Sequence, residues 1–124
     1  MVLNEENCAK LNALVRVMRR QKVTKADVMG MFNTNERTAR DMLREIALRC
    51  PVISVSNEQG YRIVNWSNPE DVKDGKHTYN ENLKRAVETI KRNYPYAARL
   101  GRDLLHDVEN ALADYKKVSE EVSG

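Results

Sequence analysis

Residues 24–64 constrain the fold more than any other part of this chain. They hold two short runs with helical apolar spacing, followed by two runs rich in β-branched and aromatic residues. This order predicts a short helix, a second helix and a small β-hairpin. A lone two-stranded hairpin is only marginally stable in water, so we expect it to pack on the helices.

Three helices are predicted in the first half of the chain, over residues 5–20, 24–33 and 36–49. Thr24 is placed to cap the second helix, with Asp27 three residues later in the capping-box position. The third helix should turn one apolar stripe inward, with Met42 at its margin; that stripe is Ala39, Leu43, Ile46 and Ala47.

The segments that join these elements carry turn signals. Residues 33–35 read Asn-Thr-Asn, which favours a turn and offers an N-cap for the third helix. Pro51 stops that helix, and two strands are predicted over residues 52–56 and 61–64. Gly60 ends the turn between them and is expected to have a positive φ.

The third helix also carries a row of arginines on the face that its apolar residues leave free. Arg37, Arg40 and Arg44 follow at i, i+3 and i+7, so they fall within about one sixth of the helix circumference. Such a row is compatible with a solvated face that has acidic neighbours. The hairpin directly after the helix favours DNA binding instead, because a basic helix followed by a β-wing can enter the major groove.

We therefore predict a mostly α (α+β) fold, a winged helix-turn-helix with a two-stranded β-wing and a C-terminal helical hairpin or coiled-coil appendage. Residues 24–46 and 51–63 resemble the winged helix-turn-helix of the biotin-operon repressor and of small phage and mobile-element regulators. In that family a wing closing in Gly-Tyr-x-hydrophobic follows a strand beginning Pro-Ile or Pro-Val. This chain departs from the pattern where Asn33 or Thr34 replaces the usual turn glycine, and we expect no counterpart of the family's large ligand-binding domain.

The predicted contacts with DNA form three groups. An arginine fork bonds guanine, and an asparagine amide bonds adenine. The residues expected to contact bases, as the resemblance also implies, are Asn35, Arg37, Thr38 and Arg40. Those expected to hold the DNA backbone are Arg20, Lys25 and Arg44. The wing residues expected to reach the minor groove or the backbone are Ser56, Asn57, Gln59 and Arg62.

The chain divides into a DNA-binding domain over residues 1–66, a linker over residues 67–78 and a helical tail over residues 79–124. In the linker, a short helix is expected to be interrupted at Asp74-Gly75. The tail has a 4-3 apolar spacing, and Pro95 should divide it into helices over residues 80–93 and 95–118. The candidate oligomerisation residues are Leu83, Val87, Ile90, Leu104, Val108 and Tyr115. This seam fits a packed helical hairpin and a homodimer about equally.

Charge supports this division. The net charge is +3. Residues 1–66 hold 11 Lys and Arg against 7 Asp and Glu, whereas residues 67–124 hold 10 against 11. The basic surplus thus lies in the half with the helix-turn-helix pattern, as expected for a nucleic-acid binder.

The remaining motifs point away from catalysis and from membranes. Cys8 and Cys50 have no CxxC partner and are expected to be reduced thiols of a cytoplasmic protein. No signal peptide or membrane-spanning run is expected. His77, in a predicted polar loop, and His106 have no Cys or His at metal-ligand spacing. We expect no enzyme activity, metal, cofactor or small-molecule ligand.

The expected partner is therefore double-stranded DNA, bound by a transcriptional regulator or a phage or mobile-element accessory factor. The alternative is a protein–protein interaction or scaffold module of a replication or assembly complex that uses the heptad tail. Two aromatic residues, Tyr61 and Trp66, are expected to cover the small core at the base of the wing.

Overall fold

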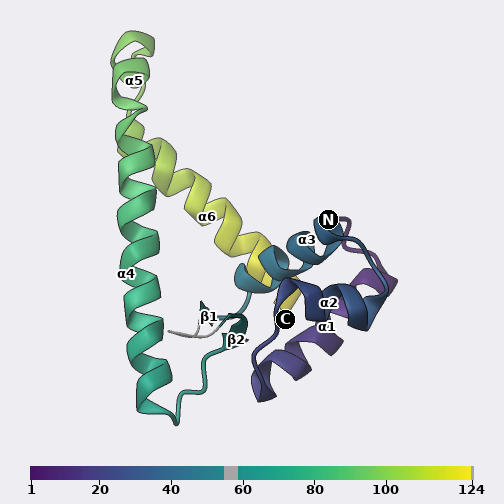
Figure 1. The fold of residues 1–124 in the computed structure, drawn as a ribbon. Coiled ribbons are helices and arrows are strands. Elements are labelled where there is room, and N and C mark those ends of the chain that lie inside the picture. Colours follow the sequence, from purple (N-terminus) through teal and green to yellow (C-terminus); the bar gives the residue numbers. More distant parts are fainter. Residues whose placement is uncertain (55–58, 124) are drawn as a thin grey trace. The chain divides into compact units, whose positions relative to one another are not determined.

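The computed structural model describes residues 1–54 and 59–123, with side chains described as far as residue 116 (Figure 1). In this part of the chain the structure is mostly helical, with one small antiparallel sheet, so the coarse α+β prediction is confirmed. The chain separates into two units, Met1–Tyr79 and Asn80–Gly124.

The first unit begins with three helices, α1 (Glu5–Arg20), α2 (Lys25–Phe32) and α3 (Glu36–Ala47). Figure 1 shows α3 beside α2, and α3 also packs on α1. The core between them is apolar and consists mainly of Leu11, Leu14, Met18, Val28, Ala39, Met42 and Ile46. Met42 is therefore central to the inner face of α3, while Ala47, which we expected there, is exposed.

The helix ends follow the local capping signals. Thr24 and Asp27 form the predicted capping box, with the Asp27 backbone N–H donating to Thr24 Oγ1 at 3.1 Å. Asn33 ends α2 in the left-handed region at φ 48°, so it replaces the usual turn glycine. Asn35 caps α3 by accepting the Thr38 N–H at 2.8 Å.

The sheet pairs β1 (Val52–Ser54) with β2 (Tyr61–Ile63), Ile53 lying opposite Arg62. Val23, between α1 and α2, joins it as an isolated bridge, because its N–H and C=O both bond to Tyr61 at 2.8 Å. The hairpin therefore packs on the helices as expected, with β2 against α1.

The expectation that aromatic side chains cover the base of the wing is wrong. Trp66 is 67% exposed and Tyr61 is 43% exposed. Among the described residues of this region Ile53, Ile63 and Val64 are buried instead, and Ile63 belongs to the core that the helices form.

The predicted break at Asp74-Gly75 does not occur. Helix α4 (Pro69–Lys91) runs through both residues, so most of the expected linker is regular helix. Asn68 and Pro69 start α4 as the sequence indicates, with Asn68 Oδ1 accepting the Glu70 N–H at 3.0 Å. One interior glycine costs a helix only about 1 kcal/mol relative to alanine, which the surrounding backbone hydrogen bonds offset.

The second unit contains the end of α4, the short α5 (Tyr94–Leu100) and α6 (Leu104–Ser123). Pro95 lies in the first turn of α5 and divides the tail as predicted. The expected helix over residues 95–118 is nevertheless broken, because Gly101 caps α5 in the left-handed region at φ 65°. Of the candidate oligomerisation residues, Leu83, Val87 and Tyr115 are exposed, and Ile90, Leu104 and Val108 are half-buried.

Candidate nucleic-acid interface

Helix α3 has two chemically opposite faces. Ala39, Met42 and Ile46 are buried on one side, and the arginines at 37, 40 and 44 are all exposed on the other. The 3.6-residue period of the helix separates the two sets, since the arginines follow at i, i+3 and i+7. The predicted basic face is therefore present and accessible.

A single carboxylate organises part of that face. Glu36 Oε1 accepts a bond from Lys25 Nζ at 2.7 Å and another from Arg40 Nη2 at 2.8 Å. The Lys25 ammonium, and then the Arg40 guanidinium, hold the pKa of Glu36 below its ordinary value. The start of α2 is thereby linked to the start of α3. Lys25 and Arg40, predicted to contact backbone and base respectively, lie together on this one acid.

Two of the arginines are not engaged in this way. The side chains of Arg37 and Arg44 form no hydrogen bond or ion pair with any other residue that the structure describes. Both side chains are exposed, Arg37 in the first turn of α3 and Arg44 two turns further along. They are the cations of this face that remain available to an external anion.

The other two predicted base contacts, Asn35 and Thr38, take part in the N-cap of α3. The side-chain oxygen of Asn35 accepts the Thr38 N–H, as the N-cap of α3 requires. The Thr38 side chain is half-buried, whereas Asn35 is exposed. Asn35 could still present its amide hydrogens to a ligand, since the cap occupies only the oxygen.

Some of the predicted backbone and wing contacts are exposed, and one of the wing residues is bonded within the chain. Arg20 is exposed in the last turn of α1, and Gln59 is exposed before β2. Ser56 and Asn57 lie outside the described residues. Arg62 is half-buried and bonds to a carboxylate of its own chain, so it would have to leave or share that partner in order to contact a phosphate.

The partner of Arg62 is Asp71, the one buried charged side chain in the described part of the chain. Asp71 lies in the first turn of α4 and is 1% exposed. One of its carboxylate oxygens bonds to Arg62 Nη2, and the other accepts the Asn65 backbone N–H at 3.0 Å. Sequence reasoning missed this residue, because an acidic residue in a first helical turn ordinarily indicates no more than a favourable interaction with the helix dipole.

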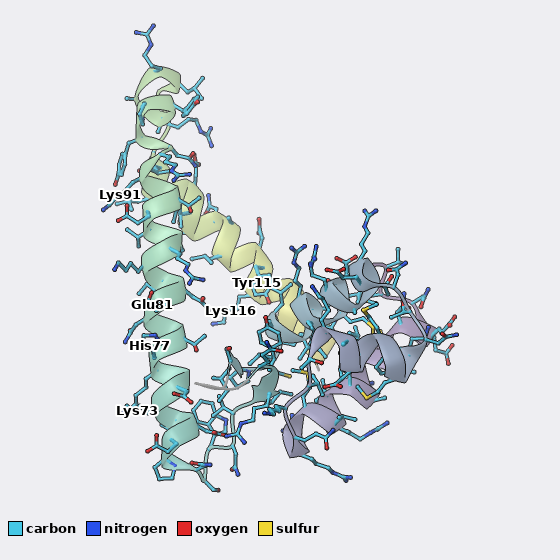
Figure 2. All side chains as sticks on the ribbon, viewed as in Figure 1. Lys73, His77, Glu81, Lys91, Tyr115 and Lys116 are labelled. Carbon is cyan, nitrogen blue, oxygen red and sulfur yellow. The ribbon has the colours of Figure 1, made fainter. Side chains whose placement is uncertain are left out.

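The structure offers little else for chemistry. Among the described residues no group of three or more His, Cys, Asp and Glu side chains could hold a metal ion. His77 lies on α4 rather than in a polar loop, and Figure 2 shows it beside Lys73 and Glu81 along the helix.

A shallow open cleft of about 470 Å³ lies between Trp66 and the first turns of α4, lined also by Pro69, Val72 and Lys73. None of the helices in the described chain is long and apolar enough to cross a membrane.

Comparison with known proteins adds no identification. No protein-family model, no curated protein and no solved structure matches this chain.

Proposed function

We propose that the unit Met1–Tyr79 is a winged helix-turn-helix that binds double-stranded DNA without catalysis. In this proposal α3 enters the major groove and the hairpin of β1 and β2 is the wing beside it. The observation that carries the proposal is the exposed arginine face of α3 opposite its buried stripe. The chain would act as a transcriptional regulator or as a phage or mobile-element accessory factor.

The contacts on α3 support distinct roles for its arginines. Arg37 has no partner among the described residues and lies in the first turn, the part of a recognition helix that meets base edges. Arg44, also without such a partner, lies where a helix leaves the groove floor and approaches phosphates. Arg40 would have to leave Glu36, or share it, in order to contact DNA.

The hairpin supports the proposal through its attachment. Tyr61 pairs with Val23, and Arg62 pairs with Asp71, so β2 is held both to the linker between α1 and α2 and to the start of α4. A wing held in this way is pre-organised beside the recognition helix, which lowers the ordering cost of binding.

The test is reversal of the two unpaired arginines, Arg37→Glu with Arg44→Glu. The control is Arg85→Glu with Arg92→Glu, which makes the same charge change on exposed α4 and turn positions of the second unit. Affinity for a mixed-sequence duplex, measured by fluorescence anisotropy, should fall at least about 30-fold in the first variant. It should fall much less in the control.

Equal affinities of the two variants would contradict the assignment of α3. Such a result would favour the competing function, in which the first unit is a scaffold and the helical tail binds a partner protein. Circular dichroism of both variants would show whether the fold is retained.

A further inference from the structure

The second unit lacks a core of its own. Between residues 80 and 116, the only buried side chain that the structure describes is Ala97. Large apolar side chains are exposed instead, at Leu83, Val87, Tyr94, Tyr96, Leu100, Leu105, Leu112 and Tyr115. Most of the stability of a helix in a protein comes from packing its amphipathic face. The second unit therefore needs a partner surface that covers these apolar side chains.

The apolar side chains form one stripe on each long helix. On α4 the stripe is Leu83, Val87 and Ile90, spaced i, i+4 and i+7. On α6 the half-buried Leu104 and Val108 continue it with the same four-residue step. In heptad terms, position 87 and position 108 are a positions, and positions 83, 90 and 104 are d positions.

The edges of the two stripes carry opposite charges at matching intervals. Lys84 and Lys91 are seven residues apart and occupy e positions on α4; Figure 2 shows Lys91 on this helix. Asp107 and Asp114 are also seven residues apart and occupy g positions on α6. Asp107 already accepts two bonds from Arg102, at 3.1 and 2.7 Å, and a carboxylate has room for further donors.

This charge pattern discriminates between two ways of covering the stripes. Within one chain α5 reverses the direction, so that α4 and α6 could pair only as an antiparallel hairpin (Figure 1). Antiparallel pairing places e beside e, and the lysine edge would then meet Leu105 and Leu112, the e residues of α6. Parallel pairing places e beside g, which brings lysines to aspartates. Charges at e and g positions set partner choice and orientation in coiled coils.

We infer that the partner is a second copy of this chain, joined by two parallel pairings of α4 from one copy with α6 from the other. Residues 80–93 hold four basic residues against two acidic ones, and residues 104–116 hold three acidic residues against one lysine. A two-fold axis makes both pairings equivalent and gives a closed dimer. In each of the two pairings, the lysine edge of α4 from one copy then meets the aspartate edge of α6 from the other.

The experiment is sedimentation equilibrium of the full chain without DNA, so its outcome is independent of the proposed DNA binding. Wild type should be a dimer in the micromolar range. Lys84→Glu with Lys91→Glu should weaken association about 250-fold, because each of four surface charge pairs loses an attraction worth a factor of about two and gains a repulsion of about the same size. The matched control, Arg85→Glu with Arg92→Glu, places the same charge change on the opposite side of the seam and should still dimerise.

A rescue completes the test. Adding Asp107→Lys and Asp114→Lys to the lysine-reversal variant should restore the dimer, with helicity checked by circular dichroism. A wild-type chain that stays monomeric at about 100 μM would overturn the inference. So would equal weakening by the lysine variant and the control, or a rescue variant that stays monomeric although it is as helical as wild type.

Discussion

Replacement of Asp71 by alanine should destabilise the first unit strongly. Its carboxylate is 1% exposed and accepts bonds from Arg62 on β2 and from the Asn65 backbone. The alanine variant leaves both donors without their acceptor, and the Arg62 Nε is already buried without a partner among the described residues. The hairpin would thus lose its attachment to α4.

The magnitude follows from burial. Removing one partner of a fully buried ion pair typically costs about 3–5 kcal/mol, because the remaining charge stays desolvated. The Arg62 side chain is 31% exposed, so water can solvate part of the guanidinium in the variant. We therefore expect a loss of about 2–3 kcal/mol from the free energy of unfolding. Asp71→Asn keeps the volume and one acceptor oxygen and should lose less.

Urea denaturation followed by circular dichroism measures this loss, and Trp66, the single tryptophan, provides a second signal. Glu70→Ala is the matched control, since it removes an exposed acid from the same helical turn and should cost less than about 1 kcal/mol. A loss below about 0.5 kcal/mol for Asp71→Ala would show that the pair of Asp71 and Arg62 does not stabilise the first unit. Replacing both members, Arg62→Leu with Asp71→Leu, should recover much of the stability, because an apolar pair leaves no buried charge.

Further consequences can be measured on the same chain. Gly60→Ala should lower the free energy of unfolding by about 1–3 kcal/mol in urea, because φ is 126° and the new Cβ would lie 3.1 Å from the Val23 carbonyl oxygen; an unchanged midpoint would contradict this. Glu36→Gln should tighten duplex binding a few-fold at low salt by releasing its two basic partners, and weaker binding would count against the interface. The pKa of Glu36 is lowered in the folded chain, so its contribution to stability is present above its ordinary value of 4.5 and is lost as the pH falls through the lower folded value. As the pH is lowered, the unfolding midpoint should therefore fall less steeply in Glu36→Gln than in wild type.

The helix ends of the first unit could be predicted because local residues determine them. The capping box of Thr24 and Asp27 and the N-cap of Asn35 involve partners three residues apart. The basic face of α3 follows equally from helical periodicity. Such short-range signals survive in any fold that contains the helix.

The errors arise where distant contacts or competing local signals decide the outcome. Gly75 lies inside α4, whereas Gly101 ends α5. Amino-acid composition alone does not predict which of these glycines ends a helix. The sequence does not show that Arg62 is paired, because its partner Asp71 lies in the next helix. A salt bridge between separate elements depends on the packing of those elements, which periodicity does not encode.

The measurement that tests DNA binding most directly is anisotropy of a mixed-sequence duplex titrated with the wild-type chain over a salt series. We expect binding at about 50 mM salt that weakens steeply, with a log–log slope between about −3 and −6 as several phosphates lose their counterions. No binding at that salt concentration, or an affinity that does not change with salt, would rule out the proposed electrostatic contact with DNA.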